Sequence, residues 1–343
     1  MLELLNTLYI LTEGSYAHLD HDTIKIQVNG ETKLRLPLLN FGSIVCFGNV
    51  LISPALMSAC AEDGRAITFL STNGKYLARI EGSQITNALL RHTQHQRSDD
   101  AQFAMQTAKN CVAGKMQNSR SVIMRAARES GNADDTDVLR ETASVLAEDI
   151  LHLQDADSTD AIRGFEGFAA QKYFSVFDTM VKVNNDQFRF EARTRRPPLN
   201  PVNALLSFSY TLLLHDCISA LCGVGLDPLI GFLHTLRPGR PALALDLMEE
   251  FRPIFADRLA LTLINRQQIT AADFIFYDSG AVYLNEKGRK TVIAAYQKRK
   301  QANVHHFLLQ RELPLGLVPH IQARLLARTI RGDMAEYPPY VIQ

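Results

Sequence analysis

One histidine and three acidic residues have the side-chain types that hold a divalent metal ion. The first of them, Glu166, stands in the segment Arg163–Gly167, which reads Arg-Gly-Phe-Glu-Gly. In a helix that begins near residue 160, Glu166 lies on the same face as Ile162 and Tyr173. A carboxylate beside apolar neighbours costs free energy unless it is paired or binds a cation. The alternative is a surface glutamate that pairs with Arg163, three positions earlier.

The other three candidates lie close together in the sequence. His234 ends the segment Gly231–His234 and precedes a turn at residues 237–240. A single histidine is more often a core residue than a ligand. However, Asp246 and Glu249 follow it, three positions apart on a predicted helix that must turn apolar residues inward. The alternative is that these two acids stay in water near the start of the helix, where its dipole favours negative charge.

Together, one imidazole and three carboxylates suit magnesium or manganese, because hard oxygen ligands prefer these ions and manganese tolerates a nitrogen ligand. A metal ion of this kind can activate a hydroxyl nucleophile and polarise a phosphodiester. The sequence has no G-x-x-x-x-G-K-[ST] loop, no G-x-S-x-G turn and no H-E-x-x-H helix. The residues therefore give no support to an ATPase, an α/β-hydrolase or a zinc protease.

Composition limits the class of protein. The chain has 343 residues, of which 46% are hydrophobic, and this length predicts two domains of roughly 150 residues each. The 36 basic and 36 acidic residues cancel, so a nucleic-acid partner would have to bind to local basic patches. No C-x-x-C pair, basic leader or long uninterrupted apolar run is present. We therefore expect a cytoplasmic protein that does not bind membranes, with its cysteines buried as free thiols. These are Cys46, Cys60, Cys111, Cys217 and Cys222.

The pattern along the chain predicts an α+β protein, with a small β-rich N-terminal domain (residues 1–83) and a larger, mainly α-helical catalytic domain (84–343). Short β-branched and aromatic runs separated by turn residues predict the strands. Helical spacing then predicts nine helices, at residues 84–95, 98–129, 136–155, 159–175, 201–222, 227–234, 241–258, 286–302 and 318–331. Four side chains are expected to cap helices, namely Ser53, Ser98, Ser158 and Asn200.

Basic residues gather in several stretches of the second domain. Such runs are usually solvated faces, but several in a neutral protein favour contacts with DNA phosphates. The arginines before Asn200-Pro201 also lead into a helix N-terminus, which favours phosphate. The predicted DNA-binding residues are Arg189, Arg193, Arg195, Arg196, Arg240, Arg324 and Arg328.

Three segments, in this order, give the chain a resemblance to a known family over nearly its whole length. They are Gly164–Gly167, Asn200–Tyr210, and the stretch from Gly231–His234 through Gly239-Arg240-Pro241 to Asp246–Pro253. Each segment alone is weak, but the combination is specific. The sequence resembles the universal CRISPR-associated endonuclease of the adaptation complex, in its subtype I-C branch.

The resemblance implies a metal-dependent DNA endonuclease and integrase that inserts short spacers into a CRISPR array by 3′-hydroxyl attack. Glu166, His234 and Glu249 match the family's catalytic metal ligands, and Asp246 matches a nearby acid. Because the family often has Asp where Glu249 stands, the relative roles of Asp246 and Glu249 stay open. The resemblance also implies a homodimer that joins a small ferredoxin-fold CRISPR protein in a hetero-hexamer holding DNA. We expect the β-rich domain to form the dimer.

Two other functions remain compatible with the residues. One is a catalytically idle DNA-binding scaffold, which metal-dependent cutting or joining of DNA would exclude. The other is an unrelated metal-dependent phosphoesterase, which would not bind DNA with salt-sensitive affinity.

Overall fold

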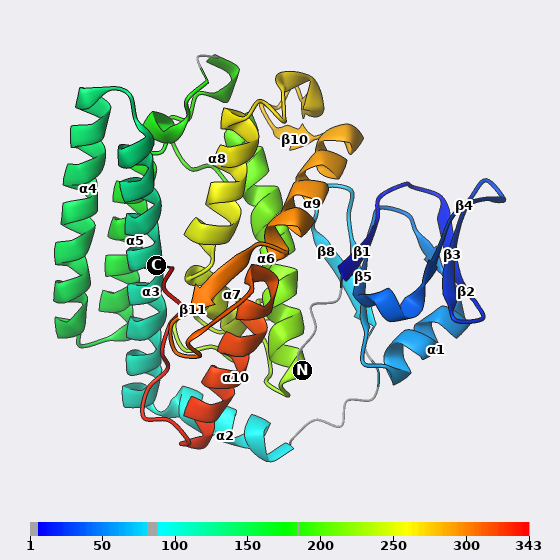
Figure 1. Cartoon of the computed structure of the whole chain (residues 1–343). Coiled ribbons are helices and arrows are strands. Elements are labelled where there is room, and N and C mark those ends of the chain that lie inside the picture. The colour runs from blue at the N-terminus through cyan, green and yellow to red at the C-terminus, as the bar shows by residue number, and fades with distance from the viewer. Residues whose placement is uncertain (1–5, 81, 83–87, 184–185, 343) are drawn as a thin grey trace.

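A computed structural model shows a small β-rich part followed by a larger, mainly helical part (Figure 1). It describes residues 6–80, 82, 88–183 and 186–342. The predicted α+β class is confirmed. The predicted boundary between residues 83 and 84 lies outside the described residues, as do the first four residues of the helix predicted at 84–95.

The N-terminal part contains two four-stranded sheets and one helix. The first sheet has the order β1 (Asn6–Ile10), β5 (Phe41–Phe47), β7 (Ala66–Leu70) and β8 (Tyr76–Ile80). The second has the order β4 (Glu31–Pro37), β3 (Thr23–Val28), β2 (Ser15–Asp20) and β6 (Leu51–Ile52). Helix α1 (Pro54–Glu62) begins as predicted, because the Ser53 side chain accepts a hydrogen bond from the amide of Leu56.

The helical part is built from nine described α-helices, a π-helical turn, two hairpins and several single-turn 3-10 helices. The helices are α2 (Ala88–Asp99), α3 (Ala101–Glu129), α4 (Ala133–His152), α5 (Thr159–Ser175), α6 (Pro201–Gly223), α7 (Ala242–Glu249), α8 (Arg258–Asn265), α9 (Glu286–Lys300) and α10 (Val318–Arg331). The π-helical turn is Arg252–Asp257, and the hairpins are β9 (Phe274–Phe276) with β10 (Val282–Leu284) and β11 (Asn303–His306) with β12 (Arg311–Pro314).

Helix α6 runs through the centre of this part. Asn200 caps it, as predicted, by accepting a hydrogen bond from the amide of Asn203. By length and composition α6 could cross a membrane, but 61% of its most apolar window is buried in the fold. It packs against α7, α10 and the π-helical turn. Its apolar character is therefore explained by its place in the core.

Strand β5 contributes to two cores at once. Because side chains alternate along a strand, Ile44 and Cys46 face the core of the N-terminal part. Val45 and Phe47 belong instead to the core of the helical part. The ring of Phe47 lies 5.7 Å from that of Phe208 in α6, measured between centroids. The two parts of the chain thus share a continuous apolar contact.

Three predictions about the helices are wrong. Residues 227–234 form turns rather than a helix, because the side chain of Asp246 binds their backbone amides. The helix predicted at 241–258 is interrupted, with α7 ending at Glu249 and Pro253 lying in the π-helical turn that follows. The N-cap of α3 is Asp100 rather than Ser98.

Candidate active site

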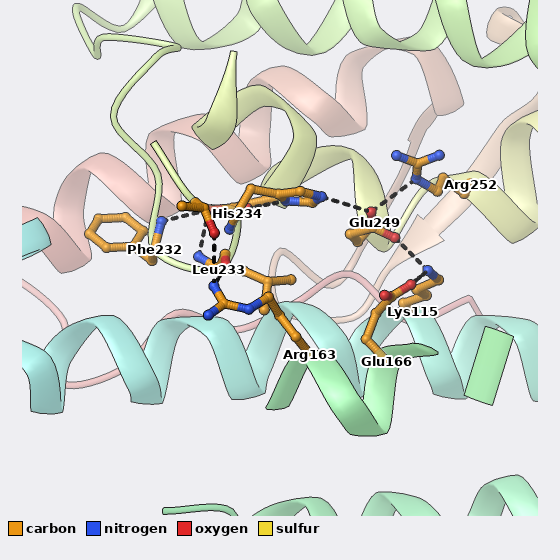
Figure 2. A network of polar contacts seen from close by, with 10 residues as sticks. Lys115, Arg163, Glu166, Phe232, Leu233, His234, Glu249 and Arg252 are labelled. Carbon is orange, nitrogen blue, oxygen red and sulfur yellow. Dashed lines mark hydrogen bonds and ion pairs between the residues drawn. The ribbon is translucent and has the colours of Figure 1, made fainter. Parts of the chain in front are cut away.

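Helices α3, α5 and α7 each supply one charged side chain to a common point (Figure 2). Glu166 comes from the middle of α5, Glu249 from the end of α7, and Lys115 from the middle of α3. The ammonium group of Lys115 contacts Glu166 and lies 2.7 Å from Oε2 of Glu249. Helix α5 begins at Ser158, as predicted, and this places Glu166 two turns into the helix. Two predicted ligands 83 positions apart in the sequence thus meet on one cation.

Glu249 is buried, with 4% of its side chain exposed, and it pairs with two cations. Besides Lys115, Nε of Arg252 lies 3.1 Å from Oε1 of Glu249. Burial raises the pKa of the Glu249 carboxyl, but the charges of Arg252 and Lys115 outweigh burial and hold this pKa at about 2. In turn, burial lowers the pKa of Lys115, while Glu249 and Glu166 overcome that effect and raise it. Glu249 and Lys115 are therefore both charged at neutral pH.

Asp246 uses both carboxylate oxygens to hold the segment that carries His234. Oδ2 accepts hydrogen bonds from the amides of Phe232 (2.6 Å) and Leu233 (3.0 Å). Oδ1 accepts one from the amide of His234 (3.0 Å) and lies 2.6 Å from its Nδ1. Of the two neutral tautomers of His234, this arrangement favours the one with the proton on Nδ1. Arg163 of α5 adds a bond from its guanidinium to the carbonyl oxygen of Leu233, at 2.9 Å.

Gly231 is required for this close approach. A Cβ atom at position 231 would lie 2.5 Å from Oδ2 of Asp246 and 2.7 Å from the carbonyl carbon of Ala242. Neither contact can relax without moving α7 or its carboxylate. The absence of a side chain at position 231 therefore lets the His234 segment lie directly against the helix that carries Asp246 and Glu249.

Three of the four predicted ligands, Glu166, Glu249 and His234, belong to one series of close contacts. Glu166 and Glu249 already share one cationic atom, and Nε2 of His234 lies 3.9 Å from Oε1 of Glu249. Two donors that each bind an ion at about 2.1 Å can be this far apart. As they stand, the described side chains form no cluster of three metal ligands, and Lys115 lies between the two carboxylates. The donor set fits magnesium or manganese once Lys115 moves aside.

The predicted DNA-binding arginines differ in what they contact. Arg193 is half-buried and donates hydrogen bonds to Oδ1 of Asn203 (2.8 Å) and Oγ of Ser207 (3.1 Å) on α6. Arg240 is half-buried as well. The remaining members of the predicted set are exposed, namely Arg189, Arg195, Arg196, Arg324 and Arg328.

Tyr210 links the basic loop to the candidate site. The guanidinium carbon of Arg193 lies 5.4 Å from the centre of its ring, and that of Arg252 lies 4.7 Å from it. The Tyr210 hydroxyl donates a hydrogen bond to Oδ1 of Asp257, at 2.6 Å. Because Arg252 also pairs with Glu249, the loop at 189–196 and the carboxylates are joined by a continuous set of contacts.

Sequence reasoning missed two cations in this site, Lys115 and Arg252. For each of them, a neighbouring residue pattern in the sequence indicates that the cation needs an acidic partner. Lys115 interrupts the buried stripe of α3, between Cys111 and Asn118, and a lysine on a buried face needs an anionic partner. Arg252 stands three positions after Glu249, close enough to pair with it.

Comparison with known proteins identifies the family. The family model for CRISPR associated protein Cas1 matches residues 8–298. A CRISPR-associated endonuclease Cas1 of Moorella thermoacetica is 54% identical over 338 residues, which are 98% of each chain.

Two solved structures share the fold. A casposase bound to its integration product is 23% identical, with a TM-score of 0.81 over 97% of this chain and 93% of that chain. A chain of a Cas6-RT-Cas1–Cas2 complex is 21% identical, with a TM-score of 0.81 over 99% of this chain and 36% of that chain. Since the family model and the relative both cover most of its length, the chain belongs to the family of CRISPR-associated Cas1 endonucleases.

Proposed function

We propose that this protein is a metal-dependent integrase that inserts short DNA spacers into a CRISPR array by attack of a 3′-hydroxyl on the repeat. The observation that carries the proposal is that Glu166 and Glu249 contact one ammonium group, while Nε2 of His234 lies 3.9 Å from Oε1 of Glu249. Membership of the Cas1 family and a fold shared with a casposase support DNA joining as the reaction.

Glu166, His234 and Glu249 would hold the magnesium or manganese ion. When bound, such an ion activates the attacking hydroxyl and stabilises the charge on the reacting phosphate. Asp246 would act as a positioning residue, because its oxygens are occupied by the His234 segment. The proposal therefore takes Glu249, rather than Asp246, as the ligand.

The cations around the carboxylates have a second role in this proposal. Arg252 stays beside Glu249 and offsets the cost of burying a charge in the protein. Lys115 would leave its position between the carboxylates when the ion binds. Its ammonium group then lies near the anionic substrate, where it can contact a phosphate oxygen.

The surroundings of the site fit DNA as substrate. Arg195 and Arg196 are exposed on the loop that Tyr210 joins to the site, and we propose that they contact DNA phosphates. Arg189, Arg240, Arg324 and Arg328 would extend this contact along the backbone without reading base sequence.

We further propose that the protein works in the cytoplasm as a homodimer. Two such dimers would join two copies of a small ferredoxin-fold CRISPR protein in a hetero-hexamer. The solved Cas6-RT-Cas1–Cas2 complex supports a partner of this kind. Membership of the subtype I-C branch remains a proposal from the sequence segments that carry the resemblance.

The variant Glu166→Gln tests the function. The amide keeps the shape of the side chain but lacks the charge that attracts a hard cation. Joining of a short duplex to supercoiled DNA in manganese should fall at least 100-fold, while DNA affinity stays within twofold of wild type. Asp160→Asn, at an exposed position on the same helix, is the matched control and should join normally.

The same experiment separates the alternatives. Joining by wild-type protein without added metal, or by Glu166→Gln at more than a few per cent of the wild-type rate, would disprove the proposed site. Salt-sensitive DNA binding without any joining or cutting would indicate a scaffold. Absence of DNA binding would indicate an enzyme for small phosphoesters.

A further inference from the structure

The tail Tyr337–Ile342 follows α10 and runs along α3 in an extended form (Figure 1). It forms neither a helix nor a strand, yet Tyr337 and Tyr340 are only 1% and 0% exposed. Backbone groups that leave water need hydrogen-bond partners, and a segment without regular structure must find them elsewhere in the fold. The tail finds its partners on α3 and at the end of α7, two of the helices that supply the candidate site.

Two asparagines of α3 bind the backbone of the tail. Nδ2 of Asn110 donates a hydrogen bond to the carbonyl oxygen of Tyr337, at 2.9 Å. Nδ2 of Asn118 donates one to the carbonyl oxygen of Tyr340, at 2.8 Å, and its Oδ1 accepts one from the amide of Ile342, at 2.9 Å. Since these asparagines stand about two helical turns apart, the tail is fixed along a substantial length of α3.

Glu250, the residue after the proposed ligand Glu249, binds the tail with both carboxyl oxygens. Oε1 accepts a hydrogen bond from the hydroxyl of Tyr337, and Oε2 accepts one from the amide of Tyr340, each at 2.7 Å. Nδ2 of Asn118 also donates to the backbone carbonyl oxygen of Glu250, at 2.8 Å. Glu250 is buried, so these bonds are shielded from water. The tail thus connects α3 to the C-terminal end of α7.

Gly114 lets the tail lie directly on α3. A Cβ atom at position 114 would be 2.7 Å from Cβ of Pro339 and 3.4 Å from Cβ of Glu250. Glycine is a poor helix former, and this one stands in the middle of a long helix. Close packing against Pro339 gives a physical reason for it. Because Gly114 precedes Lys115, the tail touches α3 one residue from the lysine that pairs with Glu249.

We propose that the tail is a positioning element of the candidate site, which holds Glu249 at its distance from Lys115. On each helix the tail contacts the neighbour of the charged residue, namely Gly114 beside Lys115 and Glu250 beside Glu249. Helix α7 ends at Glu249, and the bonds from the tail hold a helix end whose last carbonyl groups lack helical partners. The ion that Glu249 is to bind rests on the proposed function, whereas the attachment of α7 to α3 does not.

The variant Gly114→Ala tests this role in the full chain. Alanine favours the helix, but its Cβ must push Pro339 away, and this draws the amide of Tyr340 from Glu250. We expect amide hydrogen exchange in residues 246–251 of the metal-free protein to become about tenfold faster. A ligand that is not held in place loses more conformational freedom on binding an ion. The manganese concentration for half-maximal DNA joining should therefore rise about tenfold, while the rate at saturating manganese stays within roughly twofold of wild type.

Two further variants make the result specific. Gly114→Ala/Pro339→Gly removes the proline atoms that the new Cβ would meet, so it should return both the exchange rate and the manganese requirement toward wild type. Gly223→Ala adds the same methyl group at the end of α6, where it meets nothing within 4 Å among the described residues outside its own stretch of helix. This control should change neither quantity.

Two outcomes would overturn the proposal. Unchanged exchange in Gly114→Ala would show that the tail does not hold α7. Faster exchange with an unchanged or lower manganese requirement would show that the tail only stabilises the fold. If wild-type protein joined no DNA in manganese, the proposed function would be refuted, and the exchange rates of Gly114→Ala and its rescue variant would still decide whether the tail holds α7.

Discussion

Nζ of Lys115 lies 2.7 Å from Oε2 of Glu249 and also contacts Glu166, so one ammonium group neutralises two carboxylates of the candidate site. A protein that binds a metal ion at this point must first separate the lysine from both acids. The lysine therefore stabilises the metal-free protein, and it would compete with the ion proposed for this site.

Lys115→Met should expose this competition. With 11% of its side chain exposed, Lys115 is nearly buried, and its loss leaves two unpaired carboxylates. We expect the free energy of unfolding in metal-free buffer to fall by about 3 kcal/mol. Manganese should then raise the Tm of the variant more than that of wild type, because no lysine has to be displaced. Scanning calorimetry with and without manganese measures both effects.

The control for this test is Lys287→Met, which removes an exposed lysine that pairs with Asp273. It should change neither quantity by more than a few tenths of a kcal/mol. If manganese raised the Tm of Lys115→Met no more than that of wild type, the lysine and the metal ion would not share one position.

Asp246→Asn should distinguish a positioning residue from a ligand. An amide has one acceptor oxygen, so it cannot replace both oxygens that hold the amides at 232–234 and Nδ1 of His234. We expect a loss of about 2–4 kcal/mol of stability in metal-free buffer, together with a 10–100-fold loss of manganese affinity. Chemical denaturation and metal titration measure the two quantities. A variant that lost metal binding but gained stability without metal would identify Asp246 as a direct ligand.

Asp257→Asn should change how stability depends on pH. Burial raises the pKa of Asp257 to about 6, above its ordinary value of 3.8, so the folded protein keeps a proton that the unfolded chain releases. The contribution of Asp257 to the free energy of unfolding is therefore fully present below pH 4 and is lost as the pH rises to 6. A difference of about 2 units corresponds to roughly 3 kcal/mol.

Urea denaturation from pH 4 to pH 7 measures this contribution. The difference in unfolding free energy between wild type and Asp257→Asn should shrink by about that amount over the interval. Asp278→Asn, on an exposed turn, should follow wild type throughout. A constant difference would show that Asp257 does not titrate in this range.

The exposed edge of the second sheet should form part of the homodimer. Strand β4 lies at this edge, and Leu34 and Leu39 are 41% and 64% exposed. Leu34→Glu/Leu39→Glu should weaken self-association at least tenfold in sedimentation experiments, because unpaired edges and apolar surface favour association. Leu151→Glu, at a 71% exposed position on α4, is the control. Equal association of both variants would locate the dimer contact elsewhere.

Local signals in the sequence predicted much of the fold. Ser53-Pro54, Ser158 and Asn200-Pro201 begin helices as expected, because a cap and the first helical turn depend on neighbouring residues. The hairpin of β9 and β10 likewise turns at Asp278–Gly280, where aspartate and glycine favour a turn. Strand β5 shows no polar alternation from Ile44 to Phe47, because this run is buried on both faces.

The remaining errors arise from contacts that are distant in the sequence. The helix predicted at 227–234 does not form, because the amides of Phe232 and Leu233 donate to the Asp246 carboxylate instead of to helical carbonyl groups. No pattern within residues 227–234 indicates this distant acceptor. The apolar segment Ile44–Phe47 is buried between two cores, and the second of these is made by helices that follow residue 84. Lys115 was not expected in the site, because its partners come from α5 and α7. The acidic and histidine residues of the site could thus be predicted from the sequence. The basic residues that neutralise them could be identified only from the fold.

Strand β5 contributes side chains to both cores, and this limits how the protein can be recombined with its relatives. A chimera with residues 6–80 from one homologue and the helices from another would take Phe47 and its contact Phe208 from different parents. Each parent has its own fit between these surfaces, so a swap with a mismatched volume at Val45 or Phe47 would leave a void or a clash in the helical core. Engineers who exchange the N-terminal part should therefore transfer the facing residues of α6 together with it.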